Sequence, residues 1–404
     1  MMRRGLVWLG RLCLLGTVLC TAMLAWLHWR PAPQWDVAFG PAGWRLHLNG
    51  DHLVRFATQP WIFRAVSGRS FTTRFGHLNL IREGNGLLVR CAPCTLRAAA
   101  YPETVVHLTQ VDLRLTRSGD TLRGTLASGA VTMSWQGLLS PGGLALNGEL
   151  PATPAQDVLG LLYRDIPEIV RIRVEGSIGG HFALSLPDKR WQLTPDIRIL
   201  RVAGLGTEAL RGLQPVPACA SVAAGGFGQR IGKAVIAAED QRFANHLGYD
   251  PQELAAALTP NIRQGHSLRG ASTLDEQVAR MLFTGASRSP VRKLRELLYA
   301  IEMDRTLGKA QIMRLYLSLA PWGDGICGVE AAARHYLGKP SNRLNLQEAA
   351  WLASLLRNPS LVHSAPEAVR QHARWVLKGM PGIGRRERRV AEQALSSPLL
   401  AGLP

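Results

Sequence analysis

The pattern of apolar and polar positions changes twice along the chain. Residues 5–29 are almost wholly apolar and are interrupted only by Arg11 and His28. Residues 36–205 show the alternation of half-buried β-strands, separated by turns rich in Gly, Asn, Asp and Pro. After residue 213 apolar residues recur with the period of helices, about 3.6 residues. The pattern predicts an α+β multidomain protein with parts at 1–30, 31–213 and 214–404.

The first apolar stretch is long enough to cross the hydrocarbon core of a membrane. Arg3 and Arg4 precede it, so the positive-inside rule leaves the N-terminus in the cytoplasm. We therefore expect residues 1–30 to form a cytoplasmic tip and a transmembrane signal-anchor helix. A cleaved signal peptide is the alternative, although no small-x-small cleavage site follows the apolar core.

The alternating part predicts a β-rich domain, with strands such as 105–115 and 122–135 and one short helix at 154–163. Its histidines are scattered, and we find no catalytic arrangement in it. We interpret it as a scaffold or a partner-binding domain. Cys91 and Cys94 form a Cys-Ala-Pro-Cys segment, for which a structural disulfide is the favoured interpretation. A redox pair and half of a zinc site are the alternatives.

The chain has 404 residues with 47 Lys and Arg against 29 Asp and Glu, a net charge of +18. No run of five like charges occurs, which argues against a nucleic-acid-binding arm. The helical part at 221–404 carries 24 basic and 15 acidic residues. An anionic membrane surface or an anionic substrate therefore fits the charge better than nucleic acid does.

Polar residues that helix packing does not require occur first at the end of a helix predicted over 231–246. Glu239 and Asp240 follow an apolar run, and Phe243 and His246 come next. A carboxylate at the edge of a core can act as an acid or base near neutral pH. The alternative is a helix cap or a salt-bridged pair.

A second group starts at Gly270, where two hydroxyls, Ser272 and Thr273, lead into a helix with Gln277 and Arg280. Such a turn can donate hydrogen bonds to an anion or a sugar. The alternative is an ordinary helix start capped by one of the hydroxyls.

A third group consists of Arg288, Arg292, Lys293 and Glu296, on a helix predicted to begin at Ser289 and Pro290. Arg292 and Glu296 are four residues apart and share a face, as in a surface salt-bridge ladder. The same basic residues suit a diphosphate, because Arg donates forked pairs of hydrogen bonds to phosphate oxygens. A Gly-rich turn at 322–330 is the fourth group.

Together these groups resemble the peptidoglycan glycosyltransferase (transglycosylase) domain family of class A penicillin-binding proteins and monofunctional transglycosylases, over about 231–360. Residues 239–248 are similar to the family motif EDxxFxxHxG, 270–277 to GGSTITQQ and 292–296 to RKxxE. Residues 309–338 and 346–359 are similar to the fourth and fifth motifs. All five occur in the family order.

The resemblance implies an all-α, lysozyme-like domain that polymerises lipid II with inversion and releases polyprenyl diphosphate. It implies Glu239 as the catalytic base and Glu296 as the second catalytic carboxylate, which would orient the basic residues or a divalent cation, Mg²⁺ or Mn²⁺. No organic cofactor is expected. The residues implied in binding the substrate and its diphosphate are Ser272, Thr273, Gln277, Arg280, Arg288, Arg292 and Lys293. Asp240, Phe243, His246 and Gly270 complete the motifs.

The partners implied are lipid II, lipid-linked glycan and the membrane, with cell-wall synthesis proteins binding the β-rich domain. The expected location is the bacterial cytoplasmic (inner) membrane, with a single span and the catalytic domain on the periplasmic side. No penicillin-binding transpeptidase motifs follow the helical domain.

Several departures from the family motifs change polar or charged groups. Asp275 and Glu276 replace Thr and Gln, which adds two carboxylates near an anionic substrate, Arg280 replaces a phosphate-binding Lys, and Ser318 replaces an Asn. Two alternatives to polymerisation remain. One is a lysozyme-like glycan-cleaving enzyme, which the basic residues argue against because cleavage involves no diphosphate. The other is a catalytically degenerate scaffold that binds lipid-linked glycan.

Overall fold

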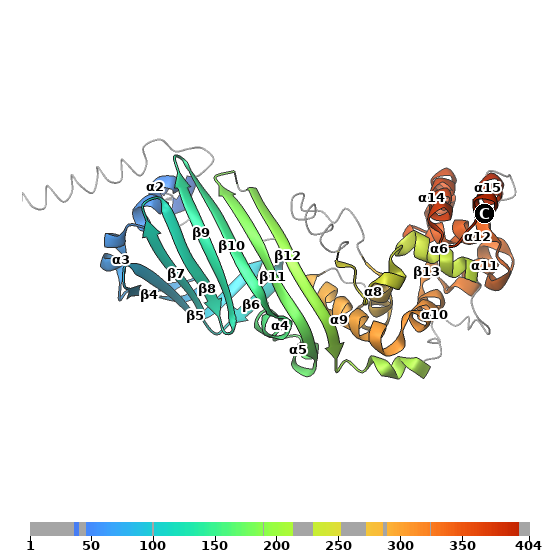
Figure 1. Cartoon of the computed structure of the whole chain (residues 1–404), viewed down its shortest axis with the longest axis horizontal. Helices are drawn as coiled ribbons and strands as arrows, with labels where there is room; N and C mark the ends of the chain where they lie inside the picture. The colour runs from blue at the N-terminus through green and yellow to red at the C-terminus, as the bar shows by residue number, and fades with distance from the viewer. Residues whose placement is uncertain are drawn as a thin grey trace, which may run out of the picture. The chain divides into compact units, whose positions relative to one another are not determined.

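The computed structural model describes most of the chain, and these residues form two compact units (Figure 1). The first unit consists of the chain as far as Arg164 together with Ser177–Arg198. The second consists of Asp165–Gly176 together with the chain from Ile199 onward. The described residues are 36–39, 46–98, 101–188, 190–212, 229–251, 272–285, 289–323 and 325–395.

The expected fold is wrong in one respect: it included a transmembrane helix. None of the helices in the described ranges combines the length and apolar character needed to cross a membrane. The longest of them, α9 (Pro290–Leu307), carries charged residues along its length. The expected anchor at 1–30 lies outside the described residues. The structure instead has a large antiparallel sheet in the N-terminal half and helices in the C-terminal part.

The sheet has ten strands in the order β12-β11-β10-β9-β8-β7-β5-β4-β3, and β6 also pairs with β5 (Figure 1). A separate hairpin, β1 (Asp36–Phe39) and β2 (Leu46–Asn49), comes before it. The ten strands are β3 (Ser70–Thr73), β4 (Gly76–Glu83), β5 (Gly86–Ala98), β6 (Tyr101–Leu108), β7 (Val111–Ser118), β8 (Thr121–Ser128), β9 (Val131–Ser140), β10 (Gly143–Pro154), β11 (Arg173–Leu186) and β12 (Arg190–Ala203).

Four short helices accompany the strands: α2 (Gly50–Ala57), α3 (Pro60–Val66), α4 (Ala155–Leu162) and α5 (Pro167–Arg171). The position of α4 confirms the helix predicted at 154–163. The two stretches predicted as strands, 105–115 and 122–135, each contain a turn. Successive strands therefore form hairpins, and sequence neighbours lie side by side in most of the sheet.

Aromatic rings cover glycines across the middle of the sheet. Gly124, Trp135, Gly148 and Phe182 are paired in one row on four neighbouring strands. A Cβ atom added to Gly148 would overlap the ring of Phe182, and one added to Gly124 would lie 2.8 Å from Trp135 Cζ2. Each ring occupies the space above the glycine beside it, which pins the register of the strands.

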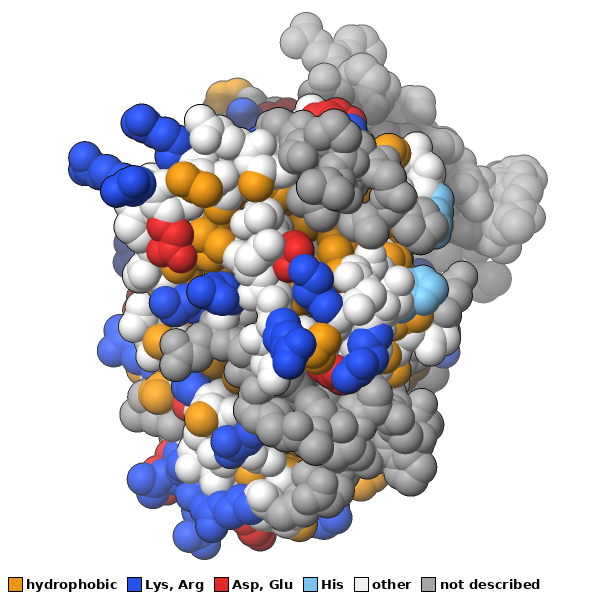
Figure 2. Space-filling view, turned by 90° about the vertical axis from the view of Figure 1, so that its right-hand side faces the viewer, with side chains coloured by type: hydrophobic (Ala, Val, Ile, Leu, Met, Phe, Trp, Pro, Cys, Tyr) orange, Lys and Arg blue, Asp and Glu red, His pale blue; other side chains and the backbone are white. Residues whose placement is uncertain are grey.

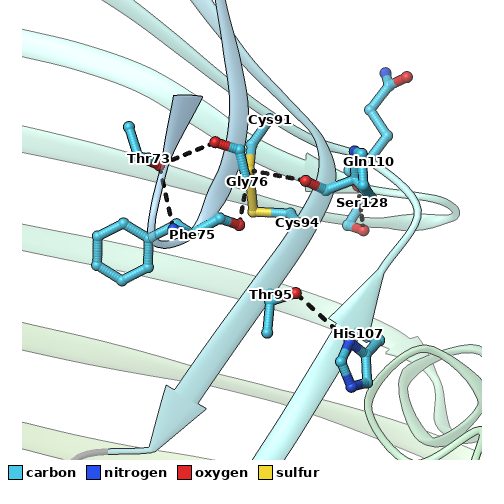
Figure 3. Close-up of a disulfide and its surroundings, with 10 residues drawn as sticks. Thr73, Phe75, Gly76, Cys91, Cys94, Thr95, His107, Gln110 and Ser128 are labelled. Carbon is cyan, nitrogen blue, oxygen red and sulfur yellow. Dashed lines mark hydrogen bonds between the residues drawn. A yellow bond between two sulfur atoms is a disulfide. The ribbon is translucent and has the colours of Figure 1, made fainter. Parts of the chain in front are cut away.

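Cys91 and Cys94 form a disulfide within β5, which confirms the favoured interpretation of the Cys-Ala-Pro-Cys segment (Figure 3). Both residues are buried and pack with Leu108. Gly76 on the neighbouring strand has a φ of 135°, and a Cβ there would clash with the carbonyl of Pro93. Cys327 is also disulfide-bonded, a role that the sequence alone does not indicate.

The helices of the second unit pack around one apolar core, in which Trp322, Tyr316, Ile312 and Leu352 are fully buried. The expectation of an all-α domain is wrong in detail, because β13 and β14 form a short hairpin. The elements are α6 (Gln229–Glu239), η3 (Phe243–Asn245), α8 (Leu274–Ala279), η4 (Arg280–Thr284), α9, α10 (Lys309–Leu319), β13 (Pro321–Gly323), β14 (Ile326–Cys327), α11 (Val329–Leu337), η5 (Ser341–Arg343), α12 (Leu346–Ser354), η6 (Leu355–Arg357), α13 (Leu361–Ser364), α14 (Pro366–Gly379) and α15 (Arg385–Ala394), after η1 (Thr207–Gly212).

Two helix boundaries decide where the polar residues lie. The helix predicted over 231–246 ends at Glu239, and the chain then turns through η3. The predicted start of α9 is confirmed, because Ser289 is the N-cap and its hydroxyl accepts the backbone N–H of Arg292 at 3.1 Å. Gly308, with a φ of 73°, ends α9 and directly precedes α10.

Basic side chains are distributed over the surface. Figure 2 shows one face, on which Lys and Arg are spread among polar and apolar groups and outnumber acidic side chains. This distribution agrees with the absence of a long basic run in the sequence. The positive charge of this face is therefore spread out.

Candidate active site

Glu239 is the last residue of α6, and its side chain is half-buried. The apolar face of α6, including Ile231, Ala234 and Val235, is buried in the core, so the position of the helix end is fixed. The Gln277 Nε2 group on α8 donates a hydrogen bond to Glu239 Oε2 at 2.9 Å. The carboxylate is therefore oriented by a side chain from the second motif.

Tyr316 on α10 continues this hydrogen-bond chain, because its hydroxyl donates to Gln277 Oε1 at 3.4 Å. Burial, followed by the charge of Glu239, raises the pKa of Tyr316 well above its ordinary value, while Arg280 lowers it. The phenol therefore stays protonated and remains a donor. The sequence analysis did not single out Tyr316, although the residue lies in the stretch that resembles the fourth motif.

Asp240 and His246 do not face the same way as Glu239 but enter a buried polar cluster. His246 Nε2 lies 2.9 Å from Asp240 Oδ2, and the same oxygen accepts the backbone N–H of Leu274 at 2.9 Å. The first motif is thereby bonded to the first turn of α8. These two residues position the backbone around Glu239.

Lys309 lies at the centre of this cluster, and its ammonium group contacts several elements. Its Nζ atom is 3.2 Å from His246 Nδ1, 3.3 Å from both carboxylate oxygens of Asp275 and 2.7 Å from Asp304 Oδ1. It also lies 4.6 Å from the ring centroid of Phe243, a cation–π distance. Each ring nitrogen of His246 therefore has a polar partner, the Lys309 ammonium at Nδ1 and the Asp240 carboxylate at Nε2.

Asp240, His246 and Asp275 form a group of the kind that holds a metal ion, because one potential ligand atom from each lies within 4.8 Å of the others. The chemistry of the cluster does not favour a divalent ion. The ammonium of Lys309 already contacts His246 and Asp275, and its positive charge would repel a second cation at the same place. Glu296, the expected ligand, is likewise paired with the guanidinium of Arg292.

Thr273 serves as a helix cap, the alternative that the sequence left open. Its side chain accepts the backbone N–H of Glu276, and the Glu276 carboxylate accepts the backbone N–H of Thr273, which completes a capping box. The Thr273 hydroxyl donates to the carbonyl of Gly248 at 2.7 Å. This residue fixes the start of α8 and the turn after the first motif.

Four charged side chains meet where α8 and α9 pack together. Arg292 is ion-paired with Glu296. The Lys293 ammonium lies 2.6 Å from Glu276 Oε2 and 3.7 Å from Glu296 Oε2, and it donates to Ser272 Oγ at 2.7 Å. Glu276 and Glu296 are almost fully buried, at 3% and 1% exposure. The structure thus brings most of the third group together with the second.

Three predicted site residues remain, of which only Arg280 lies in the described part of the chain. Arg280 begins η4 and is partly exposed, close enough to Tyr316 to lower its pKa. Gly270 and Arg288 lie outside the described residues. Their predicted roles stay predictions.

Comparison with known proteins bears directly on this region. Residues 219–381 match a protein-family model described as Transglycosylase. This region of the chain is therefore similar to transglycosylase domains. A biosynthetic peptidoglycan transglycosylase of Salmonella arizonae is 44% identical over 156 residues, which cover 38% of this chain and 64% of the relative. Proteins of the same name from Citrobacter koseri and Salmonella typhimurium are 42% and 44% identical over the same number of residues.

These matches confirm the resemblance that the motifs carry. The chain spans slightly less than two thirds of the length of these relatives, at 64%. The sheet lies wholly outside the residues matched by the family model, because its last strand, β12, ends at Ala203 and the match begins at 219. The family match therefore concerns residues 219–381 and not the sheet.

The sequence suggests that the two carboxylates absent from the family motif add unpaired negative charge near a substrate. The structure shows that both are paired. Asp275 is fully buried and pairs with Lys309, and Glu276 is buried and pairs with Lys293. Each carboxylate therefore has its own lysine partner.

Asp275 makes the stability of the transglycosylase domain depend on pH. Burial raises the pKa of Asp275 from 3.8 to about 7, although Lys309 lowers it. A carboxyl group with a raised folded-state pKa is protonated in the folded protein and ionised in the unfolded chain between about pH 4 and 7, so stability falls as pH rises through that window. Asp304 and His246 also act on this group, in opposite directions.

We expect the Asp275→Asn variant to gain thermal stability relative to the unchanged protein as pH rises, because Asn cannot ionise. The difference in Tm should grow between about pH 5 and 7 and then level off. Thermal unfolding of both proteins across this range measures it. A Tm difference that does not change with pH would contradict the assignment to Asp275.

Proposed function

We propose that the protein is a peptidoglycan glycosyltransferase that polymerises lipid II into glycan strands. The observation that carries this proposal is the hydrogen-bond chain from Tyr316 through Gln277 to Glu239, next to Arg280, within a transglycosylase domain. Relatives of this domain are named biosynthetic peptidoglycan transglycosylases. The domain thus combines an oriented carboxylate with nearby basic side chains.

In the proposed reaction Glu239 removes the proton from the 4-hydroxyl of the acceptor sugar. The resulting oxygen nucleophile attacks the anomeric carbon of the donor, and the bond from that carbon to the diphosphate oxygen breaks, with inversion. The electron pair of the broken bond leaves on the diphosphate. Positive side chains stabilise this developing charge, and the candidates are Arg280, Arg288, Arg292 and Lys293.

The basic side chains near Glu239 favour polymerisation over cleavage. Glycan cleavage releases no diphosphate and gives these cations no role, whereas transfer from a lipid diphosphate uses them to stabilise the leaving group. Gln277 holds Glu239 from one side, because its amide N–H donates to Glu239 Oε2 while its carbonyl accepts from Tyr316.

The proposed substrate carries a polyprenyl chain, so the reaction takes place at a membrane surface. The Cys91–Cys94 disulfide and the disulfide of Cys327 are typical of compartments outside the reducing cytosol. We propose the periplasmic face of the bacterial cytoplasmic membrane as the location. The role of the sheet is separate from the chemistry proposed here.

The experiment is to incubate the purified full chain with labelled lipid II and to resolve the products by size, with Mg²⁺, with Mn²⁺ and with a chelator. Longer glycan and released polyprenyl diphosphate are expected. Preformed glycan strands are incubated in parallel, and their shortening would indicate a cleaving enzyme instead. Binding of lipid II without turnover under every metal condition would leave only the scaffold interpretation.

A further inference from the structure

The Lys293 ammonium, expected to bind the diphosphate, is already engaged by the protein. It contacts Glu276 Oε2 at 2.6 Å and Ser272 Oγ at 2.7 Å, with Glu296 Oε2 at 3.7 Å. The Lys293 side chain is 36% exposed, whereas that of Glu276 is 4% exposed. The lysine can therefore swing towards a ligand in solvent, but the glutamate cannot follow it.

The charges of this group cancel. Arg292 and Lys293 supply two positive charges, and Glu276 and Glu296 supply two negative charges. An incoming diphosphate meets a neutral group unless one carboxylate is displaced or protonated. Burial raises the pKa of Glu276, while Lys293 lowers it. Separation from Lys293 therefore favours protonation of this carboxyl group and removes one opposing charge.

The negative charge of Glu276 is not needed for the start of α8. In the capping box the side chain at this position only accepts a backbone N–H, and Gln does this as well as Glu. Gln is the residue that the family motif has at this position. The difference between the two residues lies in the charge, and the group that this charge contacts is Lys293.

We propose that Glu276 is a specificity-determining residue that competes with the substrate diphosphate for the ammonium of Lys293. The proposal rests on the proposed function for the identity of the substrate but not for the competition itself. The diphosphate replaces Glu276 as the partner of Lys293 when it binds, and Glu276 recovers the lysine when the diphosphate leaves. A ligand with a single phosphate group has less charge with which to displace the carboxylate, so the competition favours diphosphates.

The test compares the full chain with its Glu276→Gln variant, using inorganic diphosphate as the probe in isothermal titration calorimetry. Release of Lys293 should tighten diphosphate binding by about threefold to tenfold, the range expected for removal of a partly exposed ion pair. Glu367→Gln makes the same change of charge on α14, where the exposed Glu367 pairs with Arg370. This control variant should bind diphosphate like the unchanged protein.

A second pair of variants tests whether the effect passes through Lys293. In a Lys293→Gln background the Glu276→Gln change should increase diphosphate binding much less, because the lysine for which Glu276 competes is gone and only the loss of one nearby negative charge remains. Unchanged or weaker binding in the single variant, or an equal gain in the Lys293→Gln background, would overturn the proposal. Measurement of inorganic monophosphate binding should show a smaller gain for Glu276→Gln than diphosphate does.

A measurement on the unchanged sequence covers the case in which Glu276→Gln folds poorly. Lysines are reductively methylated with ¹³C, and the Lys293 signal is identified by its loss in Lys293→Gln. Titration with inorganic diphosphate should shift this signal as Lys293 leaves Glu276. A signal that stays in place at saturating diphosphate would rule out the exchange of partners.

Polymerisation assays separate this proposal from the proposed function. We expect Glu276→Gln to lower the KM for lipid II by the same factor as the diphosphate affinity rises, without a matching rise in kcat. Polymerisation with an unchanged KM and unchanged diphosphate affinity would reject the competition and keep the function. Tighter diphosphate binding by Glu276→Gln, in a protein that makes no polymer, would support the competition and reject the proposed function.

Discussion

The Glu239→Gln variant should polymerise lipid II about 10²- to 10⁴-fold more slowly than the unchanged protein, the usual loss when a general base is removed. Gln has nearly the same shape and can still accept the hydrogen bond from Gln277. It cannot take the proton of the acceptor hydroxyl. The fold should be preserved, because the half-buried Glu239 lies at the end of α6 and outside the apolar core.

Initial rates of glycan formation at saturating lipid II measure this loss, with Tm recorded for both proteins. Glu387→Gln, an exposed residue on α15, is the matched control and should keep the original rate. Binding of lipid II should persist in Glu239→Gln, since the diphosphate-binding residues are intact. A rate within about twofold of the original would remove Glu239 from the reaction, because loss of a base costs far more.

The Lys309→Met variant should lose about 3–5 kcal/mol of unfolding free energy, the cost of removing one partner from a buried ion pair. Lys309 contacts Asp275 and Asp304, and it also donates to His246. Met fills a similar volume but leaves the buried Asp275 and the partly buried Asp304 without their cation. Urea unfolding of both proteins, monitored by a signal from the helical unit, measures this loss as a shift of the midpoint urea concentration.

Lys339→Met is the control for this substitution. Lys339 also pairs with a carboxylate, that of Glu348 at 2.7 Å, but its side chain is 37% exposed. A pair of this kind contributes about 0–1 kcal/mol, so the control should unfold close to the unchanged protein. Equal losses of unfolding free energy in both variants would show that the cluster around Lys309 stabilises the fold no more than an exposed ion pair does.

The sequence predicted the chemistry of the site better than its geometry. The order of the motifs identified the family, and the N-cap pair Ser289 and Pro290 located α9 correctly. Both features depend on local residue order, which a sequence shows directly. The strands of the first unit were also predictable as a class, because alternation marks a half-buried sheet.

Long-range partners were not predictable, because they depend on packing between elements. Asp275 and Glu276 looked like free negative charge until the structure placed a lysine from a different helix beside each. The end of α6 at Glu239 was missed because apolar periodicity continues through Phe243 into the turn. Tyr316 looked like one more apolar core residue, and only its position beside Gln277 shows its link to Glu239.

The bond from the Leu274 amide to Asp240 has a consequence for the motions of the protein. Asp240 also contacts His246, which contacts Lys309, and Lys309 contacts α9 through Asp304. Leu274, Asp240 and His246 are buried, so the Leu274 amide reaches water only when its neighbours separate. The Leu274 amide hydrogen should therefore exchange with solvent deuterium only when this whole set opens, at the rate of a cooperative opening and not of local fraying.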